Sequence, residues 1–223
     1  MIKIRSSLLL LACSLTLASA QAAGVSSTFD TDADGWFVSD FSGVGSAPVN
    51  WNAGVIQTGD AFAETSFHAP FKFNGDWSGL YGSSLSFDLT EVGRDAGADA
   101  YYTALIASGT DVLYWYGGAP LTTFSTFTAP LSALDTRWRL GGSGFNPASG
   151  VAPTQAQFQG ILGNVTRLQI NGEFITGSDD TRLDNVILGA VPEPHTYLML
   201  SLGLVAVGVG ARRMKRPTAG PSA

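Results

Sequence analysis

Hydrophobic and polar positions divide this chain into three regions with different patterns. A mainly apolar run covers residues 8–17, and an uncharged, mostly apolar run covers residues 196–211. Between them, short segments rich in Phe, Tyr, Trp, Val and Thr alternate with clusters of Gly, Asn, Asp and Ser. This alternation is typical of an antiparallel β-sandwich, in which each strand turns one face to the core and the other to water.

The central region is expected to contain ten strands and almost no helix. Polar and apolar residues alternate throughout Ser84-Leu85-Ser86-Phe87-Asp88-Leu89, as they do in a strand with one wet face. A tight turn is predicted at Ser108-Gly109-Thr110-Asp111, so the strands on either side should form a hairpin. The expected strands cover residues 27–30, 35–41, 49–56, 61–67, 83–90, 100–108, 111–116, 123–129, 165–174 and 182–188.

One short helix is expected at residues 155–162, laid across an edge of the sandwich. Thr154 and Gln157 have the spacing of a capping box, and Gly163 stands where the helix should end. The apolar face of this helix consists of Phe158, Ile161 and Leu162.

The uncharged run at residues 196–211 predicts a single C-terminal transmembrane helix. Its residues would rise about 24 Å as a helix, against roughly 30 Å for the hydrocarbon core of a bilayer. A buried helix of a soluble core is the alternative, but prolines precede this run and four cations follow it. Those cations favour the cytoplasmic side, which makes residues 217–223 a cytoplasmic tail. They are Arg212, Arg213, Lys215 and Arg216.

Residues 191–216 combine three unlike elements in a fixed order: Val191-Pro192-Glu193-Pro194, the apolar segment and Arg212-Arg213. Together these elements resemble the PEP-CTERM sorting signal of exopolysaccharide-producing Gram-negative bacteria. The resemblance implies that an exosortase-type membrane enzyme acts near the Pro-Glu-Pro sequence. His195 departs from the pattern, because a small residue is commoner there, and so does the extension beyond the basic cluster.

Residues 1–23 have the features of a signal peptide. Lys3 and Arg5 precede the apolar run, and small residues follow it. Lipoprotein acylation at Cys13 is the alternative, but the apolar run continues past this cysteine, the only one in the chain. With ordinary cleavage the mature protein contains no cysteine, so disulfides cannot stabilise it. Cleavage is expected after Ala20, Ala22 or Ala23.

The remaining domain, residues 24–190, is strongly acidic. It contains 17 acidic and 6 basic residues, which gives a net charge of about −11. Such a domain repels nucleic acid and anionic membrane surfaces, and it attracts divalent cations.

A series of short motifs runs through this domain in a fixed order. The motifs are Phe29-Asp30 with Gly35-Trp36, Trp51-Asn52-Ala53-Gly54-Val55-Ile56, the run from Ala69 to Trp77, Leu80-Tyr81-Gly82 with Leu85-Ser86-Phe87-Asp88-Leu89, the segments from Phe158 to Thr166 and from Asn171 to Phe174, and Leu183-Asp184-Asn185-Val186. In this order they resemble the laminin IV type A (laminin B) domain of extracellular matrix proteins. The resemblance implies a jelly-roll-like β-sandwich related to carbohydrate-binding modules, without catalytic residues. The cysteine-rich modules that flank the animal domains are absent from the sequence, so an animal matrix role does not carry over.

A structural calcium site is one candidate for the chemistry of this domain. Asp30, Asp32 and Asp34 have the spacing of the first half of a calcium loop, and Gly35 permits a sharp turn. Phe41 stands where an EF-hand would have its bidentate Glu, so this is not an EF-hand. In a sandwich whose first and last strands lie side by side, an acidic residue from across the sheet can complete the site. The alternative is a solvated acidic turn without a metal. Asp184 is the expected fourth ligand, with Asp179 and Asp180 as alternatives.

A glycan-binding surface is the second candidate. Tyr114 and Tyr116 should share one face of the predicted hairpin, with Trp115 on the other. If one face is exposed, its rings can stack on sugars; otherwise they pack in the core. Trp36, Trp51 and Trp77 are expected in the core.

Catalysis has little support in the sequence. His68 is the only histidine of residues 24–190, it lies among apolar residues, and no G-x-S-x-G elbow accompanies it. The sequence therefore predicts a non-catalytic, exported, exosortase-sorted protein of the surface or extracellular matrix. Adhesion or exopolysaccharide binding in a biofilm is the expected role, after transient anchoring at the inner membrane with the domain in the periplasm. A secreted glycan-active enzyme is the alternative.

Overall fold

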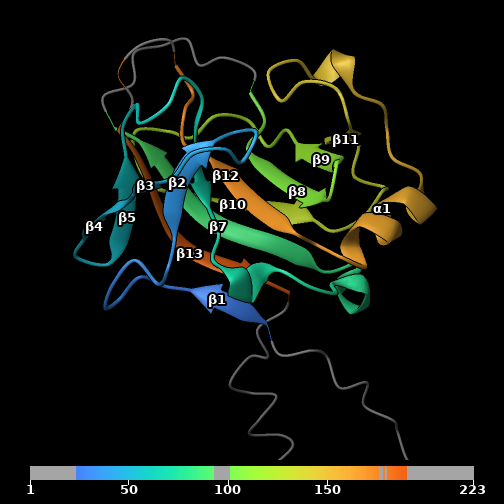
Figure 1. The fold of residues 1–223 in the computed structure, drawn as a ribbon, viewed down its shortest axis with the longest axis horizontal. Helices are drawn as coiled ribbons and strands as arrows, with labels where there is room; N and C mark the ends of the chain where they lie inside the picture. Colours follow the sequence, from blue (N-terminus) through green and yellow to red (C-terminus); the bar gives the residue numbers. More distant parts are fainter. Residues whose placement is uncertain (1–23, 93–100, 176–177, 179, 190–223) are drawn as a thin grey trace, which may run out of the picture.

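Two antiparallel β-sheets pack face to face, with one short helix at their side (Figure 1). The computed structural model describes residues 24–92, 101–175, 178 and 180–189. The expected signal peptide, sorting signal and membrane helix lie outside these residues. Within them, no helix combines the length and apolarity that a membrane crossing requires. The predicted all-β sandwich with one short helix is confirmed.

The six-stranded sheet contains the longest strands. Its order is β10-β7-β13-β5-β4, and β1 lies beside β13. The first and last strands are therefore neighbours, which is the arrangement that completion of the calcium site from β13 requires: Val25 pairs with Leu188 and Ser27 with Val186. These strands are β1 (Val25–Ser27), β4 (Asn50–Asn52), β5 (Val55–Thr58), β7 (Ser84–Glu91), β10 (Ser125–Pro130) and β13 (Thr181–Leu188).

The seven-stranded sheet has the order β11-β9-β8-β12-β6-β2-β3. Its strands β8 and β9 form the predicted hairpin, in which Ser108 pairs with Asp111 across the turn at Gly109. These strands are β2 (Phe37–Asp40), β3 (Ala47–Pro48), β6 (Thr65–His68), β8 (Ala104–Ser108), β9 (Asp111–Trp115), β11 (Trp138–Leu140) and β12 (Arg167–Asn171). β3 and β11 were not expected, because strands of two or three residues are too short to show a period in the sequence.

The inner faces of the two sheets form the main core. Leu85, Phe87 and Leu89 of β7 meet Leu168 and Ile170 of β12 in one cluster of buried residues. The alternation of period two accounts for this, since every second side chain of each strand points inward. Trp36 and Trp77 belong to this core, as predicted.

The helix α1 (Gln155–Leu162) begins and ends where the sequence predicts. The Thr154 hydroxyl accepts a hydrogen bond from the Gln157 amide, and the Gln157 side chain reaches back to the Thr154 amide. Its buried residues are Phe158, Ile161 and Leu162, and the helix contacts β8 and β9. It lies at the side of the sandwich (Figure 1). The three 3₁₀-helices are η1 (Phe71–Phe73), η2 (Ser78–Leu80) and η3 (Pro147–Ser149).

The single strand expected at residues 49–56 is wrong. The chain forms a hairpin there, β4 and β5, in which Asn52 pairs with Val55. The two turn residues, Ala53 and Gly54, have φ values of 48° and 96°. Positive φ at both positions is what a two-residue hairpin turn requires, and alanine rarely adopts it.

Candidate functional site

The acidic loop between β1 and β2 folds into a sharp turn at one corner of the sandwich. Phe29 and Asp34 have φ values of 53° and 49°, a left-handed conformation that side chains with a Cβ seldom adopt. Phe29 is only 2% exposed, so its ring anchors the loop in the core. Gly35, with φ 78°, completes the turn as the sequence predicts.

The loop surrounds a polar cavity of about 360 Å³, here named the acidic pocket. A volume of this size falls within the roughly 300–1,000 Å³ of small-molecule sites. The residues that line the acidic pocket are Ser26, Thr28, Phe29, Asp30, Thr31, Asp32 and Asp34.

Asp34 is held by a lysine and a serine beside the acidic pocket. The Lys72 ammonium forms an ion pair with the Asp34 carboxylate and donates to the Ser26 carbonyl at 2.6 Å. The Ser27 hydroxyl donates to Asp34 at 2.8 Å and accepts from the Trp36 indole N–H at 2.9 Å. Partial burial alone would raise the pKa of Asp34, but the bonds from Lys72 and Ser27 outweigh it and lower the pKa.

The other candidate metal ligands are engaged separately. The Thr28 hydroxyl donates to Asp30 at 2.6 Å, and the Asp34 amide donates to Asp32 at 2.7 Å. Asp184 lies on β13, where burial, followed by the negative charges of Asp88 and Asp30, raises its pKa. Asp30 therefore contributes to the electrostatic environment of Asp184, although the two come from opposite ends of the domain.

Asn185 ties Asp184 to the neighbouring strand. The register of β13 against β7 shifts after Asp184, and Asn185 adopts a φ of 50° at this bulge. The Asn185 amide group donates to Asp88 at 2.9 Å and to Asp184 at 3.1 Å. Among the described residues, no three His, Cys, Asp or Glu side chains gather in a way that could hold a metal ion. Calcium binding stays a prediction.

The aromatic hairpin does not form an exposed platform. Trp115 is 1% exposed and points into the main core, 6.4 Å from the ring of Trp138. Tyr114 is 6% exposed and packs against Tyr102 on the opposite face of the sheet. Tyr116 is half-buried, and its hydroxyl donates to the Ser143 carbonyl. The three rings therefore lie on two faces, as the period predicts, and both faces are covered.

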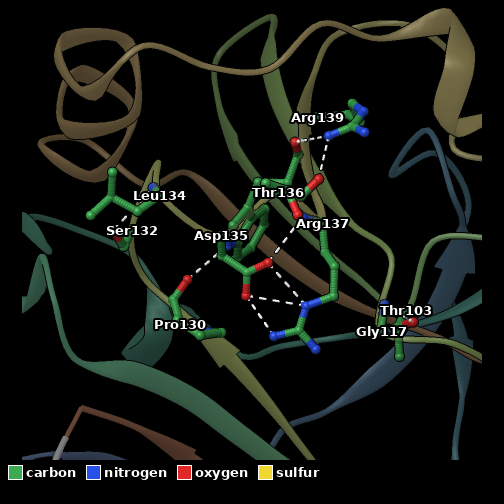
Figure 2. A network of polar contacts seen from close by, with 10 residues as sticks. Thr103, Gly117, Pro130, Ser132, Leu134, Asp135, Thr136, Arg137 and Arg139 are labelled. Atoms are coloured by element: carbon green, nitrogen blue, oxygen red, sulfur yellow. Dashed lines mark hydrogen bonds and ion pairs between the residues drawn. The ribbon is translucent and has the colours of Figure 1, made fainter.

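Arg137 covers the Trp115 ring from the solvent side. Its guanidinium carbon lies 4.7 Å from the ring centroid, which is a cation–π contact. Figure 2 shows that Asp135 holds this guanidinium with both carboxylate oxygens, at 2.9 Å from Nε and 2.6 Å from an η nitrogen. The bonds from Arg137 lower the pKa of Asp135, so the pair stays charged at neutral pH.

The Tyr114 face is covered by the loop that contains Phe145. The Phe145 ring makes edge-to-face contacts with Phe41 at 5.1 Å, Tyr101 at 4.9 Å and Tyr102 at 6.5 Å. Sugar stacking on Tyr114 would require this loop to move.

Trp51 is the one tryptophan whose exposure the sequence did not predict. It was expected in the core but is 43% exposed, on the edge strand β4. Its indole N–H donates to the carbonyl of Phe29 at 2.7 Å, and Phe29 is one of the residues that line the acidic pocket. Its two neighbours, Asn50 and Asn52, are polar and exposed, and this was the available signal.

His68 is built into the seven-stranded sheet. Its ring stacks on Phe37 with 4.3 Å between centroids, and Nδ1 lies 3.2 Å from the Ser39 hydroxyl. Burial, followed by the charge of Arg167, lowers the pKa of His68 to about 4. The imidazole is therefore neutral at physiological pH.

The two-sheet architecture, with a loop pocket at one corner, defines the class of antiparallel β-sandwich modules. The chain belongs to the laminin B (domain IV) family, whose model matches residues 66–196. A structure of the same fold is the L4b domain of human laminin alpha-2, with a TM-score of 0.62 and 13% identity over 75% of this chain and 98% of that one.

Sequence comparison gives the same family. Laminin subunit gamma-1 of Homo sapiens is 29% identical over 178 residues, which are 76% of this chain. The chain spans only 10% of the length of that relative.

A second family model, the PEP-CTERM protein-sorting motif, matches residues 190–216. The predicted resemblance to both families is confirmed. An extracellular type of domain joined to this motif makes the chain an exported, surface-directed protein that an exosortase-type enzyme processes.

Proposed function

We propose that this protein is a non-catalytic, adhesive component of the cell surface or extracellular matrix that binds exopolysaccharide in a biofilm. The observation that carries the proposal is the union of a laminin B sandwich with a PEP-CTERM sorting motif in one chain. The sandwich belongs to a family of structural proteins, and the sorting motif directs it to the surface.

Before sorting, residues 196–211 anchor the chain in the inner membrane with the sandwich in the periplasm. The exosortase-type enzyme then recognises Pro192-Glu193-Pro194, which act as recognition residues and catalyse nothing. The basic residues Arg212 and Arg213 hold the far end of the segment on the cytoplasmic side.

A non-catalytic role is supported by the state of the one histidine in the sandwich. His68 is partly buried against Phe37 and is neutral, and its Nδ1 faces a serine hydroxyl within the sheet. The imidazole ring therefore has a structural role in the packing of the sheet. The acidic pocket contains carboxylates and hydroxyl groups, which suit hydrogen bonding to sugar hydroxyls.

Incubation of the exported protein with the host's exopolysaccharide tests this role. We expect the protein to be retained on the polysaccharide without release of shorter sugars. Release of oligosaccharides would establish the alternative, a secreted glycan-active enzyme, and would overturn the non-catalytic proposal.

Sorting is tested in the host by cell fractionation of the Glu193→Ala variant. We expect this variant to accumulate as a membrane-bound precursor, while the wild type and a Pro217→Ala control outside the motif leave the membrane. Full-length, uncut wild-type protein in the cytosol would overturn the export pathway.

A further inference from the structure

We propose that Trp51 and the acidic pocket together form the glycan-binding site of this protein, with the indole ring as the stacking surface. The inference rests on the proposed function as a glycan-binding protein and assigns it to specific residues. The ligand is an uncharged pyranose unit of a polysaccharide.

Trp51 is the tryptophan that is available to a ligand. The other four tryptophans of the chain are between 0% and 3% exposed, whereas Trp51 is 43% exposed. It lies on β4, which pairs only with β5 within the part of the chain that the structure describes. The ring lies between two exposed asparagines, and its exposed part is an apolar surface on which a sugar can stack.

The ring of Trp51 is fixed before any ligand arrives. Its indole N–H donates to the Phe29 carbonyl at 2.7 Å, and Phe29 itself is buried. The loop is held from the other side by the chain of bonds from Trp36 through Ser27 to Asp34. A fixed ring loses little conformational entropy on stacking, and this preorganisation favours binding.

The acidic pocket supplies the polar half of a sugar site. Its carboxylates and hydroxyl groups line a cavity of about 360 Å³, and the Phe29 of this lining accepts the hydrogen bond from the Trp51 indole. A pyranose has one apolar face of C–H groups and a rim of hydroxyl groups. The apolar face can stack on the indole ring, and the hydroxyl groups can donate hydrogen bonds to the carboxylates. Neither half alone would distinguish a sugar from a cation or from an apolar peptide.

Charge determines the class of sugar. Three aspartates line the acidic pocket, and Lys72, the only lysine between residues 24 and 190, already pairs with Asp34. Among the described residues no cation forms an ion pair with Asp30 or Asp32, so an anionic polysaccharide would be repelled there, whereas an uncharged one can donate hydrogen bonds from its hydroxyl groups to both carboxylates.

Affinity electrophoresis of the exported protein tests the site, with a neutral β-glucan, a mannan, a galactan and an acidic alginate as probes beside the host's exopolysaccharide. We expect retardation by at least one neutral polysaccharide, and weakening of at least about tenfold in Trp51→Ala. Leu134→Ala is the matched control, since Leu134 is 88% exposed and does not line the acidic pocket. It should bind as the wild type does.

A second measurement needs no variant. In the wild type, acrylamide should quench mainly the fluorescence of Trp51, and the bound polysaccharide should protect it. Equal binding by wild type and Trp51→Ala would overturn the assigned site and leave glycan binding standing. Binding of alginate alone would overturn the assigned sugar class. The absence of wild-type binding to every probe would overturn the proposed function itself.

Discussion

Gly117 lies so close to the indole ring of Trp115 that a β-carbon at this position would overlap three ring atoms. The ring cannot withdraw, because it is 1% exposed, with Trp138 nearby and Arg137 above it. We therefore expect Gly117→Ala to lower the free energy of unfolding by about 1–3 kcal/mol through overpacking. Urea unfolding followed by tryptophan fluorescence measures the change.

Gly160→Ala is the matched control for that substitution. Gly160 lies in α1, and a β-carbon there would meet no atom within 4 Å. The same added methyl group should raise the free energy of unfolding by about 0.5–1 kcal/mol, since alanine favours the helix over glycine. Equal effects of the two variants would show that the Trp115 contact does not limit the packing.

His68 should make the protein less stable as the pH falls. Its pKa is about 4 in the folded protein, against an ordinary value of 6.5, because burial disfavours the charged ring. The unfolded chain thus binds more protons between these values, so stability is full above about pH 6.5 and decreases down to about pH 4. After allowance for solvent screening, we expect a loss of about 1–2 kcal/mol.

The difference between wild type and His68→Gln isolates this effect. The carboxyl groups of Glu64, Glu173 and Asp184 have raised pKa values, and their protonation works in the opposite direction in both proteins. Thermal unfolding at pH 7.5, 5.5 and 4.5 should show a smaller loss in the variant. Parallel curves would contradict the prediction.

The sequence predicted correctly those elements that are determined by residues close together in the chain. The capping box of Thr154 and Gln157 and the turn at Gly109 are determined by residues within a few positions, and both occur where expected. The turn at Ala53 was missed, because alanine gives no sign that the chain will adopt a φ of 48°. The pairing of β4 with β5 overrides that local preference.

Which faces are covered could not be predicted from the sequence. The period placed Tyr114 and Trp115 on opposite faces, but the residues that cover these faces come from loops distant in the sequence. Arg137 covers Trp115, and the loop of Gly144 and Phe145 covers the face that Tyr114 shares with Tyr102. The exposure of Trp51 has the same origin, because it depends on β4 being an edge strand. The order of strands in a sheet is a tertiary property.

Thr154→Ala should destabilise the protein because it removes the N-cap of α1. The substitution removes the acceptor for the Gln157 amide and leaves one backbone N–H of the first turn without its partner. The buried face of α1 depends on this start, so we expect a loss of about 1 kcal/mol in urea unfolding. Thr154→Ser, which keeps the hydroxyl group, should lose much less. Equal losses would mean that the methyl group, and not the cap, is what matters.

Calcium should raise the unfolding midpoint if Asp30, Asp32, Asp34 and Asp184 form the predicted site. Lys72 now neutralises Asp34, so a bound cation must displace the ammonium group. We therefore expect Lys72→Met to bind calcium more tightly than the wild type, with a larger rise of the midpoint. At a calcium concentration of about a hundred times Kd, the gain in stability is about 2.7 kcal/mol.

Two variants separate a calcium site from general screening of the acidic domain. Asp32→Ala should abolish the rise, whereas Asp111→Ala removes an exposed carboxylate that does not line the acidic pocket and should leave it unchanged. Magnesium at the same concentration screens charge equally but prefers a smaller octahedral site, so it should have little effect. A similar rise of the unfolding midpoint with both cations and in both variants would mean that screening alone stabilises the domain. The acidic pocket would then not be a calcium site, and sugar binding would be its remaining proposed role.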